Sequence, residues 1–208
     1  MSVTAEVVLT IARTYLNDDA STLWQDQLLF PKLQQAHREM QQILKSYAVY
    51  VMRTLSAPIE VLSTATSVTL PSDMMEPIQL WEAAHGGAIT TFVPMTESDP
   101  LPFLAQGATL GYWQWADETI SLVGASANRD VLIKYWRQLP IPQLNTDLIG
   151  FINGEMYLGP RVASLAAIST GNQALHDLLA GVATQSIGMV VISNRGRAMP
   201  VQGQALRP

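Results

Sequence analysis

The spacing of the hydrophobic residues changes twice along this chain, and this change constrains the fold more than any single motif. In residues 1–57 and 141–193, apolar side chains recur every three or four positions, which is typical of helices that pack on one face. In residues 58–140 they alternate with a period of two between Gly, Pro and Asp, which indicates strands and turns. Residues 194–208 follow neither period. The sequence therefore predicts an α+β fold: an antiparallel helical bundle with a β-rich insertion and an extended C-terminal arm.

Two helices are expected before the insertion. The first covers residues 4–16. The second begins around 28–31, where Pro31 is tolerated in a first turn, and carries an apolar stripe to about residue 47. His37 follows the polar side of that helix next to Arg38, so we expect it to be solvated.

Helical spacing returns after the insertion. Asn145 or Asp147 is suited to begin a helix over 148–170, because short polar side chains accept hydrogen bonds from free backbone N–H groups. A Gly-Pro pair at 159–160 is expected to kink or break that helix. Asn172 is expected to begin the last helix.

Short strands separated by turns are expected inside the insertion. A hairpin is predicted around 63–66, and one helical turn at 97–105, where Asp99 would cap and Pro100 would follow. Further strands are predicted at 77–83, 88–94, 111–124 and 130–138.

Charged residues are scarce in this chain. They make up 14% of it, against about 25% in typical proteins, while 48% of the residues are hydrophobic. A monomer would expose much apolar surface, so we expect burial in contacts between subunits. A membrane span is the rival interpretation, with the uncharged run 178–194 as its best candidate. We expect no membrane contact, because a span needs about 20 predominantly apolar residues and this shorter run contains Thr184, Gln185 and Ser186.

The charge is unevenly distributed. The net charge of −5 combines −8 in residues 1–194 with +3 in the last fourteen residues. The acidic body repels polyanions, whereas the basic end does not. The N-terminus has no basic leader and carries Glu6, so we expect a mature protein located in a cytoplasm.

Catalytic and metal-binding patterns are weak. The run HGG at 85–87 resembles the oxyanion loop of some esterases, but GASAN at 124–128 lacks the second glycine of a nucleophile elbow, so a small hydrolase is a distant alternative. Asp18, Asp19 and Asp26 cluster without the spacing of a calcium loop, which favours helix capping over a cation site. With no cysteine, three histidines and no phosphate-binding glycine motif, we expect no cofactor, no metal and no enzymatic activity.

Tryptophans concentrate in the β-rich insertion. Trp113 and Trp115, together with Tyr112, could form a stacking platform for nucleic-acid bases. Residues 97–118 contain four acids and no Lys or Arg, however, so a nucleic-acid groove would lack partners for phosphate. A sheet core or a contact between subunits is favoured. The candidate subunit interface consists of Trp81, Trp113, Trp115 and Trp136.

The order of these segments resembles the head-to-tail adaptor proteins of tailed bacteriophages, also called connector or head-completion proteins. The resemblance is carried by residues 12–44, 68–83 and 131–167. They contain a short helix, an LND turn followed by a tryptophan, a long helix, and a Y-x-R-x-L-P strand exit that leads into the closing helices. It covers nearly the whole chain and consists of packing patterns, not of a catalytic signature.

This resemblance implies a structural, non-enzymatic protein of the virion neck that is assembled in the cytoplasm of a bacterial host. It implies a ring of roughly twelve copies beneath the portal protein, closed by head-to-tail contacts. Such a ring bridges to a tail or nozzle protein and lines a channel for DNA packaging and ejection. Genomic DNA would pass through it without sequence-specific binding. The alternative hypothesis is a nucleic-acid-binding module that uses the basic tail and exposed tryptophans.

The last fifteen residues, 194–208, form the predicted arm, which the resemblance implies can extend onto the portal. Its arginines are dispersed, whereas related arms carry a tight basic pair. Ordering so long a segment costs more free energy than exposed ion pairs return, so the arm must also bury apolar side chains on a preformed surface. The residues predicted to bind the portal or another partner are Arg195, Arg197, Met199, Val201, Leu206 and Arg207.

Overall fold

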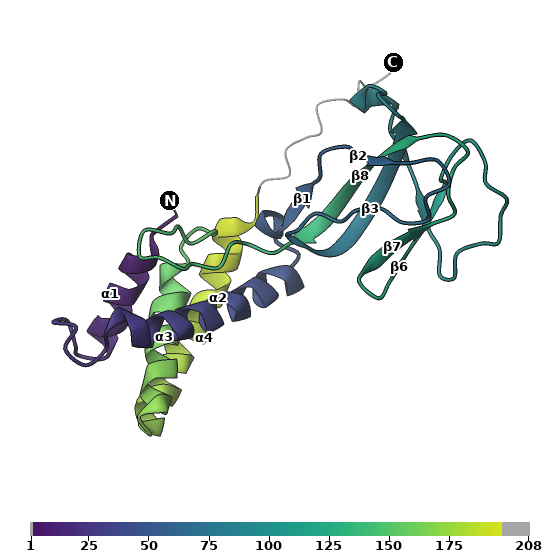
Figure 1. Ribbon diagram of the computed structural model, residues 1–208. Helices are drawn as coiled ribbons and strands as arrows, with labels where there is room; N and C mark the ends of the chain where they lie inside the picture. Colours follow the sequence, from purple (N-terminus) through teal and green to yellow (C-terminus); the bar gives the residue numbers. More distant parts are fainter. Residues whose placement is uncertain (1, 197–208) are drawn as a thin grey trace, which may run out of the picture. The chain divides into compact units, whose positions relative to one another are not determined.

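The chain folds into two compact units, which are described separately. The structure is a computed structural model that describes residues 2–196 (Figure 1). The helical unit combines the two ends of the described chain, up to Met52 and from Leu139, and the β unit comprises Arg53–Gln138. With four helices and antiparallel sheets, the described chain has the predicted α+β class.

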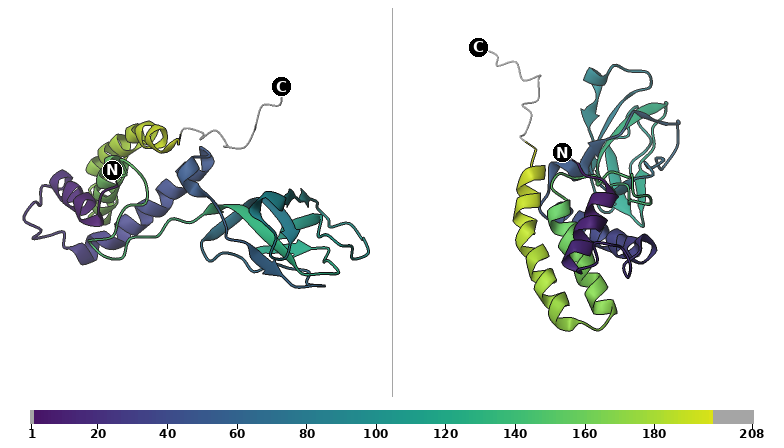
Figure 2. Two further views of the ribbon diagram at one scale, coloured as in Figure 1. Left: turned by 90° about the horizontal axis from the view of Figure 1, so that it is seen from above. Right: turned by 90° about the vertical axis from the view of Figure 1, so that its left-hand side faces the viewer.

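The helical unit is organised around α3 (Glu155–Ser169), which contacts α1 (Ala5–Tyr15), α2 (Asp26–Ser46) and α4 (Gln173–Asn194). Figure 2 shows α3 and α4 as antiparallel neighbours. A helix that is apolar on all sides is stable only when other elements surround it. This condition is met in α3, whose buried residues are Tyr157, Leu158, Gly159, Pro160, Val162, Ala163, Ser164, Ala166 and Ala167.

Gly159 marks the closest approach between α1 and α3. A Cβ atom at this position would lie 2.4 Å from Cγ2 of Ile11, so only glycine leaves room for the α1 side chain. The helix runs unbroken through Pro160, and the break predicted from the Gly-Pro pair is absent. Gly159 instead allows α1 and α3 to pack tightly.

The helix predicted over 148–170 begins late, at Glu155, because the preceding segment pairs with the N-terminus. The N–H groups of Ala5 and Glu6 donate to the carbonyls of Asp147 and Asn145, and Thr4 forms an antiparallel bridge with Leu148. The carboxylate of Asp147 accepts hydrogen bonds from two backbone N–H groups, those of residues 143 and 144. These two hydrogen bonds lower its pKa. Asp147 therefore closes a turn and does not cap α3.

The inner face of α2 contains an unexpected polar pair. His37 is fully buried, so the expectation that it is solvated was wrong. Its ring packs on Phe151 with a centroid distance of 5.3 Å, and Nδ1 lies 3.0 Å from Nε2 of Gln41. Gln41 accepts a hydrogen bond from the N–H of Leu139 and donates to the carbonyl of the same residue. The Gln41 amide thereby attaches Leu139, where the chain returns from the β unit, to α2. The side of α2 that carries Gln41 and His37 therefore faces inward.

The β unit, drawn from blue through teal to green in Figure 1, contains two small sheets. Their buried side chains share one core. The larger sheet has the order β1-β8-β3-β4, with β2 also paired to β8, and the smaller has the order β5-β6-β7. All pairs are antiparallel except β5 with β6. The strands are β1 Arg53–Leu55, β2 Ile59–Val61, β3 Met74–Ala84, β4 Val93–Pro94, β5 Thr96–Glu97, β6 Tyr112–Ala116, β7 Thr119–Leu122 and β8 Arg129–Arg137.

The strands predicted at 77–83, 111–124 and 130–138 are confirmed as β3, the β6–β7 hairpin and β8. The hairpin predicted around 63–66 is wrong. β2 pairs with β8, and Ser67 forms a bridge with Ser121, so the two arms of the expected hairpin find different partners. Distant strands compete with local ones for the same backbone groups, and local turn residues do not reveal the outcome.

Two further expectations in the β unit fail. Residues 88–94 form a 3₁₀ turn, Ile89–Thr91, followed by only two residues of strand, β4. Residues 97–105 contain no helical turn. Pro100 and Pro102 each lack an N–H, and the carbonyl of Pro100 accepts a hydrogen bond from the Ser98 hydroxyl, so the segment has few backbone groups left for helical bonds.

A buried carboxylate fixes the loop before β6. Glu82 on β3 is 2% exposed and accepts hydrogen bonds from the N–H groups of Leu110 and Gly111. It also forms an ion pair with Arg129 on β8, at 3.0 Å. A buried charge is tolerated when it is paired and fully hydrogen-bonded, as it is here. Glu82 thus anchors the long segment between β5 and β6 at its C-terminal end, next to β6.

Candidate assembly surfaces

The loop between α1 and α2 is organised by one aspartate. Asp18 is buried, and its carboxylate accepts hydrogen bonds from the backbone N–H groups of Thr22, Leu23 and Trp24 and from the Thr22 hydroxyl. The Trp24 hydrogen bond makes the largest contribution to lowering the pKa of Asp18. Nearby, Asp26 pairs with Arg13 and accepts a hydrogen bond from Asn145. The helix-capping role predicted for this acidic cluster is not observed for Asp18, which orders the loop, while α2 begins after Gln25 without a side-chain cap.

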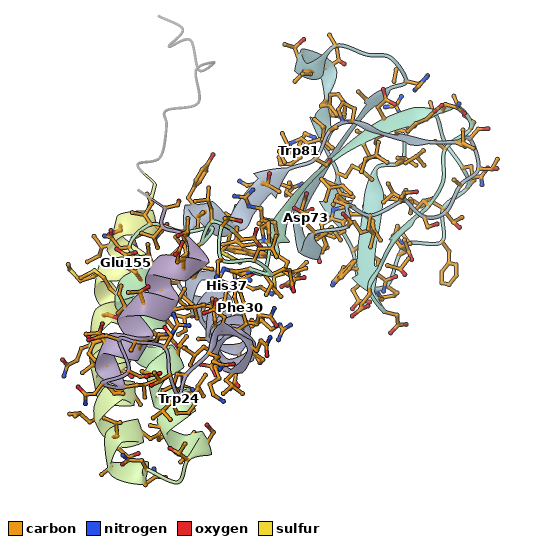
Figure 3. All side chains as sticks on the ribbon, turned by 60° about the vertical axis from the view of Figure 1, so that its left-hand side comes forward. Trp24, Phe30, His37, Asp73, Trp81 and Glu155 are labelled. Carbon is orange, nitrogen blue, oxygen red and sulfur yellow. The ribbon has the colours of Figure 1, made fainter. Side chains whose placement is uncertain are left out.

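This loop borders an apolar cleft of about 530 Å³ within the helical unit. Trp24, labelled in Figure 3, lies on the loop beside the connection between α3 and α4. Leu23 is 74% exposed at its edge. The sequence analysis missed the cleft, because its wall combines residues more than one hundred positions apart. The lining residues are Leu16, Leu23, Trp24, Leu28, Ala167, Ser169, Thr170, Asn172 and Leu175.

The structure separates the four tryptophans proposed as an interface. Trp113 is 2% exposed and belongs to the core of its own unit, which is the sheet-core alternative of the sequence analysis. Trp81, Trp115 and Trp136 are partly exposed. The guanidinium of Arg53 lies 4.7 Å above the ring of Trp136. Tyr112 lies on the opposite side of β6 from Trp113, so a continuous stacking platform does not form.

The predicted arm begins at the end of α4. Asn194, which was assigned to the arm, is the last residue of the helix and is buried. Its amide accepts a hydrogen bond from the N–H of Ile152 and donates to the carbonyls of Ile152 and Val190. Arg195 is exposed at the helix end. The arm residues Arg197, Met199, Val201, Leu206 and Arg207 lie outside the described residues.

The HGG run forms a turn held by carboxylates. Nδ1 of His85 lies 2.9 Å from Oδ1 of Asp130, and Nε2 lies 3.7 Å from a carboxylate oxygen of Glu60. The hydrogen bond with Asp130 is the main reason why the pKa of His85 is raised. Both ring nitrogens face carboxylates, so His85 does not activate a serine. Among residues 2–196, no group of three His, Cys, Asp or Glu side chains could hold a metal ion.

The helix α4 leaves much of its apolar surface uncovered. It has 22 residues and, of the described helices, it alone is long and apolar enough to cross a membrane by length and composition. The argument that the uncharged run is too short for a span was therefore wrong, because the helix begins earlier, at Gln173. One side of α4 packs against α3. Only 22% of the most apolar 18-residue stretch of the helix is buried, so most of its apolar surface is exposed.

Comparison with known families is decisive. The sequence model of the family described as SU10 adaptor protein matches residues 4–190, from the start of α1 to the last turns of α4. The chain belongs to this family. It is a phage structural adaptor of the head-tail type, as the resemblance implied. No curated protein matches the sequence. The match covers both units of the adaptor and ends before Arg195, so the arm lies beyond it.

Proposed function

We propose that the adaptor forms a ring beneath the portal protein, bridges to the tail or nozzle protein and lines the channel through which DNA is packaged and ejected. Roughly twelve copies would close this ring by heterologous contacts between neighbouring chains. In this proposal the four helices act as one bundle into which the β unit is inserted. The observation that carries the proposal is the family match over residues 4–190.

The apolar surface of the chain supports assembly from many copies. Large apolar side chains are exposed around the cleft and along α4, for example Leu23, Leu28 and Ile192. A soluble monomer rarely exposes contiguous apolar patches of this kind, and such patches mark interaction sites. We expect contacts above about 2,000 Å² in total for each pair of neighbours, involving α3, α4 and the two sheets, of which the larger carries Trp81 and Trp136 and the smaller carries Trp115.

The charge of the chain favours a channel that DNA crosses without adhering. The first 194 residues carry −8, and the stretch from Glu97 in β5 to Glu118, just before β7, has four acids and no Lys or Arg. Such a surface offers no partners for phosphate. The runner-up hypothesis, a nucleic-acid-binding module, has only the basic end of the chain in its favour.

Duplex DNA binding separates the two hypotheses. The free adaptor should bind a 30-base-pair duplex weakly at low salt, with a dissociation constant above about 10⁻⁴ M. Tight binding that weakens steeply with salt would support the nucleic-acid-binding module and contradict the channel. Cryo-electron microscopy of complete virions then tests the ring directly: density for this chain as a single copy, or as a peripheral tail decoration, would exclude it.

A further inference from the structure

Buried and exposed side chains follow a regular pattern along α4. Leu179, Ala183, Val190 and Val191 are buried, whereas a second row of residues is exposed. Leu178 is 64% and Ile192 is 69% exposed. No charged residue lies between Asp177 and Arg195. We call this exposed row the α4 seam; it consists of Leu178, Gly181, Gln185, Gly188 and Ile192.

The α4 seam has the spacing of a coiled-coil contact. Its members follow one another at intervals of three, four, three and four residues, which keeps them on one line of a helix that packs against another helix. The larger side chains Leu178, Gln185 and Ile192 occupy one heptad position, and Gly181 and Gly188 occupy the other. Large and small residues therefore alternate along the seam.

The two glycines pack against no other part of the described chain, residues 2–196. An added Cβ atom at Gly181 or Gly188 would meet nothing within 4 Å, in contrast to Gly159, where it would collide with Ile11. Glycine inside a helix is unfavourable relative to alanine. Neither glycine is explained by the turn geometry of the chain, since both lie in the interior of a regular helix. A helix from another molecule that approaches closely at these positions would account for both.

We infer that the α4 seam pairs with the α4 seam of a second copy of this chain, with the two helices antiparallel. In the register centred between residues 186 and 187, Ile192 of each copy lies over Gly181 of the other, and Gln185 lies over Gly188. Every large residue then meets a small one or the aliphatic part of Arg195. A parallel pair would place large residues against large ones and leave voids between the glycines.

Charge complementarity supports the same arrangement. The uncharged run is bounded by Asp177 at one end and Arg195 at the other, and both are exposed. In the antiparallel register, Asp177 of each copy lies beside Arg195 of the other. In a parallel pair, Asp177 would lie beside Asp177, which is repulsive. A bilayer fits this surface less well, because the amide of Gln185 would lie near its centre, where lipid offers no hydrogen-bond partner.

The pairing goes beyond the proposed ring and does not depend on it. An antiparallel self-contact has two-fold symmetry and cannot repeat around a ring that is closed by head-to-tail contacts. It therefore belongs to the free protein, where it covers the most apolar helix face. The two copies must separate at α4 before that face can meet a neighbour in a ring.

Disulfide trapping tests the antiparallel register of the two α4 helices. The chain has no native cysteine, so only the introduced cysteines can form a disulfide. The double variant Gly181→Cys/Ile192→Cys should form a covalent dimer on oxidation, seen on a non-reducing gel. Within one helix these positions are about 16 Å apart, too far for a disulfide. Each single variant should remain monomeric on the gel. The control pair Gln35→Cys/Gln42→Cys, on the exposed side of α2, should remain monomeric too. An unlinked double variant, or single variants that link equally well, would overturn the inference.

Sedimentation equilibrium tests the energetics. Gly188→Ala should raise the melting temperature of the monomer but weaken dimerisation by at least about tenfold. Asp177→Lys should weaken the dimer, and Asp177→Lys/Arg195→Asp should restore it. An unchanged dimerisation constant in Gly188→Ala would contradict the close approach. Flotation of the wild-type chain with phosphatidylcholine vesicles would instead identify a bilayer as the occupant of the seam and overturn the pairing.

Discussion

Asn194 shows how one side chain can close a helical unit. Its amide uses both its oxygen and its nitrogen on the backbone of Ile152, and it is 6% exposed. His37 is a second buried polar residue of the helical unit. Of its two ring nitrogens, only Nδ1 has a hydrogen-bond partner among the described atoms. Burial, followed by the nearby charge of Arg38, lowers the pKa of His37 to about 4.

Asn194→Ala should destabilise the helical unit by about 1–3 kcal/mol, because it leaves the N–H and the carbonyl of Ile152 without partners. Chemical denaturation followed by circular dichroism measures the change. Ser193→Ala is the matched control, since it removes one hydrogen bond to Asn153. Equal effects of the two substitutions would show that Asn194 is not an anchor.

His37 should make the free energy of unfolding pH-dependent. The unfolded chain protonates this histidine near pH 6.5, whereas the folded chain resists protonation down to about pH 4. The unfolded state therefore binds more protons in this window, and stability falls as the pH is lowered through it, by up to about 3 kcal/mol. His37→Leu should flatten the difference between pH 7 and pH 4. Carboxylates titrate in both proteins. The contribution of His37 is therefore the difference between the wild-type and His37→Leu curves of unfolding free energy against pH.

At the scale of elements, the helical unit depends on how closely α1 and α3 approach. Gly159 is required where the two helices meet, and the ring of Pro160 is buried in the same helix. In the β unit, Glu82 has the comparable role of joining β3, β8 and the loop before β6 through a single carboxylate.

Gly159→Ala should destabilise the helical unit by about 1–3 kcal/mol, because its Cβ atom would overlap Ile11. The gain in helix propensity, about 1 kcal/mol, offsets only part of this cost. Thermal unfolding measures the effect. Ile11→Ala introduced together with Gly159→Ala should be less destabilising than the sum of the two single changes. Strict additivity would mean that the two residues do not collide.

At the scale of the whole molecule, we propose that the arm and the body have separate tasks. The body contains the family match, and the basic residues beyond Arg195 lie outside it. The deletion that separates these tasks must begin after Gly196. A deletion that begins at residue 194 would remove the Asn194 anchor together with the arm.

Deleting residues 197–208 should leave the melting temperature within about 1 °C of the full chain, because the deletion removes none of the described contacts. In a phage that lacks its own adaptor gene, the truncated protein should fail to join DNA-filled heads to tails, whereas the full chain restores infectivity. Negative-stain microscopy counts the tailless heads. Normal head completion by the truncated protein would make the arm dispensable.

The sequence by itself determined the elements whose signals are local. Apolar spacing located α1 and α2, alternation located β3 and β8, and Asn172 marked the start of α4, where its side chain accepts a hydrogen bond from Leu175. These features depend on residues a few positions apart, so a short window contains their cause.

Only the tertiary structure decided which distant segments pair and which residues they bury. Residues 145–149 form backbone hydrogen bonds with the N-terminal segment, and β2 pairs with β8 and not with the segment that follows it in sequence. His37 points inward and packs on Phe151. The exposed α4 seam and the cleft beside Trp24 also depend on which faces other helices cover. Backbone groups and apolar faces can be satisfied by several partners of similar local quality. The choice is made by packing across the whole unit, which no short stretch of sequence contains.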